Sequence, residues 1–191
     1  MGDEYGMETY ENDNDMDMVD NIDDGMDIDV GDNADIEIGD STDIDVGDSV
    51  MNVTNYESRN SSLEGSIHPE TGVPFERSEV EINGEKYSIV SPKFESNYDV
   101  NLSEEKYQAT DREQFKYCND QLKSSIESDQ SLGDKFDDIQ LEQIRDGETP
   151  DGFTWHHDIQ PGRMQLVDSE IHQKTGHTGG RSLWGGGSNN R

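Results

Sequence analysis

Residues 152–180 read GFTWHHDIQPGRMQLVDSEIHQKTGHTGG, and this stretch decides the fold that we predict for the chain. Phe153–His157 and Met164–Val167 have the composition of short strands, and Pro161-Gly162 between them is typical of a turn. Asp168 follows the second strand and is a good N-cap for a short helix. The stretch therefore predicts a ββα unit, with a strand, a turn, a second strand and a helix.

Four of the five histidines of the chain fall within this unit. Imidazole is the commonest protein ligand for zinc and related ions. His156 on the first strand, His172 on the helix and His177 just past the end of the helix offer three nitrogens to one ion. Successive side chains of a strand point apart, so His156 and His157 are not expected to hold the same ion, and the spare one is free to act as a general base. Three ligands leave open positions, which is typical of a catalytic metal site.

Charge divides the chain of 191 residues into two unequal parts. Residues 1–65 hold 21 Asp and Glu against one basic residue, Arg59, for a net charge of −20 out of the total of −31. Residues 66–191 hold 24 acidic against 13 basic residues, for a net charge of −11, with most of the aromatic residues. A segment so acidic and so poor in apolar residues does not bury enough surface to fold alone. We therefore predict an acidic low-complexity tail and linker over residues 1–67 and one folded domain over residues 68–191.

The tail contains an eight-residue repeat in which acidic and apolar residues alternate before a Gly-Asp pair. The three copies cover residues 27–32, 35–40 and 43–48. Three interpretations stay open: a solvated disordered tail, a stack of short strands that binds cations, and a polyanion that mimics nucleic-acid phosphate and lowers activity at low salt.

The segment before the ββα unit supplies both strands and helices. Val80–Ile82 and Lys86–Val90 flank Asn83-Gly84, which predicts a hairpin with a tight turn. Helices are expected at residues 103–107, from Asp111 with Gln114 as its capping partner, and from Asp138, with Ile139 in the core, to Gly147. The predicted fold class is α+β.

Several classes of protein are excluded by the composition. Cys118 is the only cysteine, so intramolecular disulfides are impossible and a cysteine-based zinc finger is disfavoured. No apolar run reaches the roughly 20 residues of a membrane helix, and the acidic N-terminus lacks the apolar core of a signal peptide. We expect no membrane partner, and a protein that is cytoplasmic or exported without a recognisable signal peptide.

The ββα stretch resembles the HNH/endonuclease VII superfamily, and within it the toxin nucleases named for a conserved Trp-His-His (WHH). The resemblance extends from about residue 68 to Gly187. Its motifs are Trp155-His156-His157, Met164-Gln165-Leu166-Val167, Ile171-His172, Gly176-His177-Thr178-Gly179-Gly180 and Trp184-Gly185-Gly186-Gly187.

This resemblance implies a role for each residue of the site. His156, His172 and His177 would hold one divalent metal ion (Mg, Mn, Zn or Ni), and His157 would activate water. Gln165 would take the place of the central Asn of HNH, whose amide braces the hairpin loop.

The function that the resemblance implies is metal-dependent hydrolysis of phosphodiester bonds, of DNA rather than RNA. The chain would be a bacterial toxin nuclease used in competition, with a cognate immunity protein as its partner. Lys174 and Arg181 would hold substrate phosphates, or are solvated charges. The alternative function is a non-enzymatic acidic metal-binding or protein-interaction module.

Overall fold

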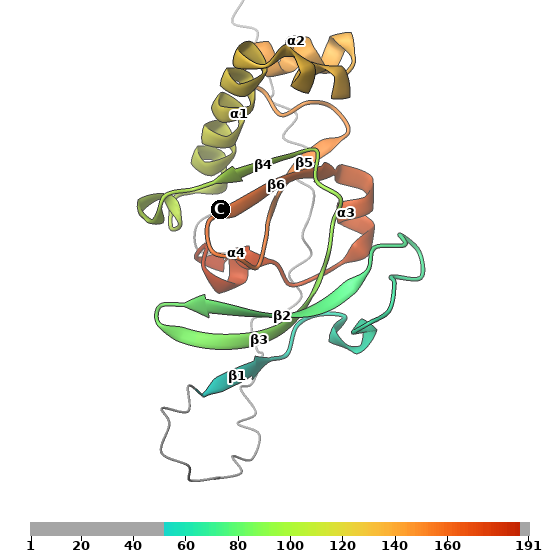
Figure 1. Cartoon of the computed structure of the whole chain (residues 1–191), viewed down its shortest axis with the longest axis vertical. Coiled ribbons are helices and arrows are strands. Elements are labelled where there is room, and N and C mark those ends of the chain that lie inside the picture. The colour runs from blue at the N-terminus through green and yellow to red at the C-terminus, as the bar shows by residue number, and fades with distance from the viewer. Residues whose placement is uncertain (1–51, 188–191) are drawn as a thin grey trace, which may run out of the picture.

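The computed structural model describes residues 52–187 as an α+β fold, which confirms the predicted class. The repeats at residues 27–48 lie outside the described residues. Two three-stranded sheets lie one above the other, and a pair of helices covers the upper sheet (Figure 1).

The first sheet is built on the predicted hairpin. β2 (Phe75–Ile82) and β3 (Glu85–Pro92) pair antiparallel, and Asn83 and Gly84 between them both adopt positive φ angles of 54° and 82°. This is the backbone of a tight primed turn, as the Asn-Gly pair predicts.

The first sheet also contains a strand that the sequence did not predict. β1 (Val53–Tyr56) pairs parallel with β3 and gives the sheet the order β1-β3-β2. A short 3-10 helix, η1 (Ser61–Leu63), follows it. Residues 52–67, which we expected to be linker, therefore carry secondary structure that precedes the predicted boundary at residue 68.

The second sheet contains the predicted ββα unit. β5 (Phe153–His157) and β6 (Arg163–Asp168) pair antiparallel, and β4 (Tyr98–Asn101) joins the other edge of β6. α3 (Ser169–Thr175) follows directly, and the Asp168 carboxylate accepts a hydrogen bond from the backbone N–H of Ile171 at 2.8 Å. The strands, the turn, the N-cap and the helix end at Thr175 are all confirmed.

Two of the predicted helices are present as α-helices but begin differently from the prediction, and the one expected at residues 103–107 is a short 3-10 helix. α1 (Asp111–Ser128) is capped by Thr110 with Glu113, and α2 (Asp138–Asp146) by Asp137 with Gln140. Each N-cap therefore lies one residue before the predicted one. The remaining elements are η2 (Glu104–Lys106), η3 (Gln130–Lys135) and α4 (Gly180–Leu183). Gly147 ends α2 as predicted, but Ile139 is 65% exposed and is not part of the core.

The two faces of the second sheet have different neighbours. One face carries Trp155, whose indole N–H donates to Asn119 of α1 at 2.7 Å, so this face packs under α1. The other face carries Val167, which forms a small buried cluster with Phe94 and Val73. Because side chains alternate along a strand, adjacent residues of β5 point to opposite faces of the second sheet.

None of the helices within residues 52–187 combines the length and apolarity that a bilayer-spanning helix requires.

Candidate metal centre

Three of the predicted ligands meet at one point. The Nδ1 atom of His156 lies 3.2 Å from Nε2 of His172 and 3.2 Å from Nε2 of His177. Three ligand nitrogens of these residues lie within 4.8 Å of one another. A tetrahedral ion with Zn–N bonds of about 2.0–2.1 Å holds its nitrogens about 3.3 Å apart, so these rings already have the spacing of a metal site.

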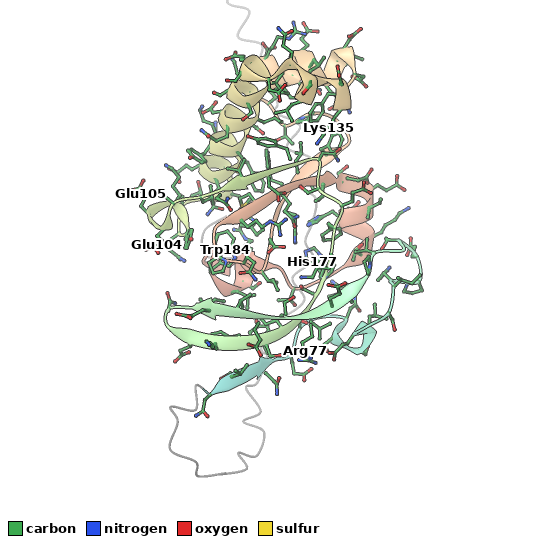
Figure 2. All side chains as sticks on the ribbon, in the orientation of Figure 1. Arg77, Glu104, Glu105, Lys135, His177 and Trp184 are labelled. Atoms are coloured by element: carbon green, nitrogen blue, oxygen red, sulfur yellow. The ribbon has the colours of Figure 1, made fainter. Side chains whose placement is uncertain are left out.

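Each ligand comes from a different part of the ββα unit. His156 sits in the β5–β6 ladder opposite Gln165, and His172 lies on α3. His177 follows Gly176, where α3 has ended, and is labelled in Figure 2 in the space between the two sheets. The hairpin, the helix and the turn after it therefore converge as the sequence predicted.

Phe94 forms one wall of this cluster, a role that the sequence did not reveal. Its ring centroid lies 4.9 Å from that of His156, 5.4 Å from that of His172 and 5.2 Å from that of His177. An apolar ring in contact with all three ligands excludes water from one side of the site. No local motif marks Phe94, because it reaches the cluster from the connection between β3 and β4.

The environment of the cluster favours neutral imidazoles. Burial lowers the pKa of His156 well below its usual value, and the neighbouring His177 and His172 lower it further. Burial also lowers the pKa of His177, with His172 adding to the effect. Neutral nitrogen is the form that binds a metal ion, so the site is ready for an ion at neutral pH.

The same shifts predict how the stability of the metal-free protein depends on pH. A histidine whose pKa is lower in the folded protein than in the unfolded protein does not reduce stability above the unfolded pKa, near 6.5. As the pH falls below about 6.5, the unfolded state binds a proton that the folded state does not bind, so the free energy of unfolding decreases. For His157, whose pKa burial lowers to about 4, the loss between pH 7 and 5 is about 2 kcal/mol. Urea unfolding of chelator-treated protein at the two pH values measures it.

The control for this prediction is His157→Gln, which removes one titrating group. Its free energy of unfolding should fall less steeply with acid than that of the natural chain. Identical pH dependence in the two proteins would contradict the assigned shift.

The Gly-Gly pair of the motif is required by close packing beside the cluster. A Cβ atom on Gly179 would lie 3.1 Å from the backbone oxygen of His157 and 3.3 Å from Nε2 of His177. One on Gly180 would overlap the backbone oxygen of Asp158, which also accepts a hydrogen bond from the Trp184 indole at 2.8 Å. Only glycine at position 180 lets this loop close over β5, and position 179 leaves little room for a side chain.

His157 lies on the other face of β5, toward α1, and not in the cluster. Its Nε2 atom lies 2.7 Å from Oε1 of Gln114, and its side chain is almost fully buried. Asp111, at the start of α1, places a carboxylate oxygen 3.8 Å from the same nitrogen and forms an ion pair with Arg181. Gln114, predicted only as a capping partner, instead contacts His157.

Gln165 is buried beside the hairpin loop. With its amide oriented to satisfy both neighbours, its nitrogen donates to Asp158 Oδ2 at 3.1 Å and its oxygen accepts from Arg163 at 3.2 Å. Asp158 in turn accepts a hydrogen bond from the backbone N–H of Gln160 at 2.8 Å. The amide thus contacts the first residue of the loop that follows His157.

The two predicted phosphate-binding residues both have acidic partners. Lys174 pairs with Glu170 one turn earlier on α3, at 2.6 Å and on the surface. Arg181 is buried and pairs with Asp111. Their contact with substrate stays a prediction.

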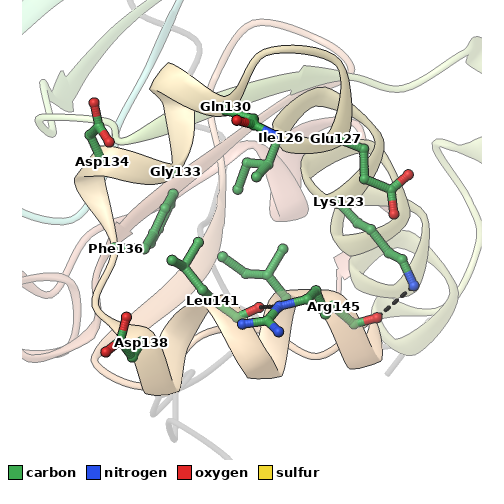
Figure 3. A pocket seen from close by; sticks show the side chains of 11 residues that line it. Lys123, Ile126, Glu127, Gln130, Gly133, Asp134, Phe136, Asp138, Leu141 and Arg145 are labelled. Atoms are coloured by element: carbon green, nitrogen blue, oxygen red, sulfur yellow. Dashed lines mark hydrogen bonds between the residues drawn. The ribbon is translucent and has the colours of Figure 1, made fainter.

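A cavity of about 620 Å³ lies elsewhere in the fold, between α1, η3 and α2 (Figure 3). Ile126, Phe136 and Leu141 supply its apolar surface, and Glu127, Asp134 and Asp138 lie around it. No histidine lines this cavity, so it is separate from the metal chemistry.

Comparison with known proteins agrees with the site. Residues 85–179 match the family described as the DNase/tRNase domain of colicin-like bacteriocins, and this match includes all three histidines of the cluster. No curated protein and no solved structure matches the chain. Residues 85–179 thus form a colicin-like DNase/tRNase domain, and the chain carries the nuclease domain of a bacteriocin-type toxin with a histidine cluster fit for one metal ion.

Proposed function

We propose that this nuclease domain hydrolyses phosphodiester bonds of DNA with one divalent metal ion held by His156, His172 and His177. The observation that carries the proposal is the spacing of the three ligand nitrogens, of which two pairs lie 3.2 Å apart. A bound ion would polarise a phosphate oxygen and stabilise the leaving 3′-oxygen.

In this proposal His157 removes a proton from the attacking water. Its Nε2 faces the amide oxygen of Gln114, which can only accept a hydrogen bond. The ring proton therefore belongs on Nε2, and Nδ1 is left with a free lone pair. The low pKa keeps the ring neutral at pH 7, and the Asp111 carboxylate at 3.8 Å stabilises the imidazolium once it forms.

Gln165 acts through the loop rather than on the substrate. It contacts Asp158, which directly follows the two histidines of β5. We infer that the amide fixes the loop and, through it, the end of β5 that presents His156 and His157.

The choice of DNA over RNA rests on the need for an external nucleophile. RNA carries a 2′-hydroxyl beside each phosphate, which serves as an internal nucleophile with acid–base catalysis alone. DNA lacks this group and requires an activated water. A site that combines a metal-binding cluster with a buried neutral histidine has the groups that the DNA reaction requires.

The substrate is tested with the full chain loaded with Mg²⁺, Mn²⁺, Zn²⁺ or Ni²⁺ in separate reactions. We expect cleavage of supercoiled plasmid with little sequence preference, because such a site positions backbone phosphates rather than base edges. Chelator should stop the reaction, and transfer RNA under the same conditions should stay intact. Cleavage of transfer RNA with plasmid untouched would overturn the assignment to DNA but leave the metal chemistry in place.

We further propose a cognate immunity protein as partner, because a cell that makes such a nuclease exposes its own chromosome. Induced expression of the full chain in bacteria should lower viability, and His172→Ala should remove this toxicity. Co-expression of a protein that binds and inhibits the chain should protect the cells. Growth unaffected by the active chain would contradict the toxin assignment.

A further inference from the structure

The third ligand of the metal cluster is the one that regular structure does not hold. His156 is fixed by the β5–β6 ladder and His172 by the hydrogen bonds of α3. His177 follows Gly176, whose φ and ψ of 49° and 101° lie outside the helix. Something other than helix or sheet must fix the position of its imidazole.

Arg59 and Asn60 are far from His177 in the sequence, but they contact the turn on both sides of it. The Asn60 amide nitrogen donates to the backbone oxygens of Thr175, at 3.1 Å, and Gly176, at 2.5 Å. The backbone N–H of Arg59 donates to the Thr178 hydroxyl at 3.0 Å. These three hydrogen bonds bracket His177, two of them to the two residues before it and one to the residue after it.

The segment that makes these contacts is itself anchored to the first sheet. Ser58 is buried, and its hydroxyl donates to the backbone oxygen of Val90 on β3 at 2.5 Å. Asn60 adopts a left-handed conformation with a φ of 64°, which turns the chain so that its amide faces the end of α3. The position of the turn is thereby tied to β3.

The turn is shaped to receive this segment. A Cβ atom on Gly176 would lie 2.9 Å from the central carbon of the Arg59 guanidinium. Glycine at this position therefore serves two purposes, since it accepts the positive φ angle and leaves room for Arg59. A larger residue would strain the positive φ angle and would displace the Arg59 guanidinium from its place beside the turn.

We propose that Arg59 and Asn60 form a positioning clamp that sets His177 in the metal cluster and so determines the affinity for the ion. This inference rests on the proposed metal site. The clamp lies outside residues 85–179, the part that matches the family, so it adds to the site a contribution from the N-terminal segment. Loss of a residue that orients a metal ligand typically weakens binding about 10–100-fold.

The test uses Asn60→Gly in the full chain. Glycine keeps the left-handed backbone conformation without strain but removes both amide hydrogen bonds. Asn83→Gly is the matched control, because Asn83 also has a positive φ angle but lies in the β2–β3 turn. Zn²⁺ affinity is measured by competition with a chromophoric chelator, and the Co²⁺ absorption spectrum reports the ligand geometry.

We expect Asn60→Gly to weaken Zn²⁺ binding about 10–100-fold and to alter the Co²⁺ spectrum, while Asn83→Gly changes neither. In a His177→Ala background, Asn60→Gly should have no further effect, because the ligand that it positions is gone.

The outcomes separate the clamp from the metal site on which it rests. Normal affinity in Asn60→Gly with weak binding in His177→Ala overturns the clamp and keeps the metal site. Normal affinity in His177→Ala overturns the metal site itself. Equal losses in Asn60→Gly and Asn83→Gly, or additive losses in the double variant, also overturn the clamp, because both mean a general structural effect.

Discussion

His157→Ala is expected to lower the rate constant of DNA cleavage by about 10²–10⁴-fold, the usual contribution of a general base. The affinity for the metal ion should stay close to that of the natural chain, because the His157 ring faces Gln114 and lies outside the ligand cluster. Single-turnover cleavage at saturating metal and calorimetric titration with Zn²⁺ measure the two quantities separately.

A second substitution distinguishes catalysis from structure at this position. His157→Gln retains a side chain that can hydrogen-bond to Gln114 but cannot accept a proton at neutral pH. It should be as inactive as His157→Ala if His157 is the base. Activity restored by glutamine, or metal lost by alanine as severely as in a ligand variant, would contradict the assignment.

His172→Ala is expected to abolish cleavage for a different reason, since it removes a ligand. The loss of Zn²⁺ affinity should exceed the roughly 100-fold upper range found for residues that only orient a ligand. Gln173→Ala is the matched control, because Gln173 is the exposed neighbour on the same helix and lies outside the cluster. Binding by His172→Ala as tight as by Gln173→Ala would remove His172 from the site.

The ββα unit was predictable from sequence because its determinants are local. Asp168 caps α3 through the N–H of Ile171, and Gly176 ends the same helix, so both signals act within a few residues. The same local geometry brings the proposed ligands together. Strand alternation alone separates His156 from His157, and the structure places their rings on opposite faces of β5.

The elements that escaped prediction depend on partners far along the chain. β1 is mostly exposed and shows no alternation of buried and exposed residues, so only its pairing with β3 defines it. Phe94 and Asn60 act on the cluster across long stretches of sequence, and neither stands in a motif. The amino-acid composition predicted a tail and linker over residues 1–67. Residues 52–63 nevertheless contain β1 and η1.

The clamp also bears on the order in which the site assembles during folding. The three proposed ligands lie within 21 positions of one another, whereas the hydrogen bonds of Asn60 span 115 and 116 positions. Short loops close at lower entropic cost and sooner than long ones. His156 and His172 can thus be brought together as soon as the ββα unit forms, while His177 acquires its final place only when the N-terminal segment docks. An ion added during refolding should accordingly be captured in a weak early state that tightens with the last step of folding.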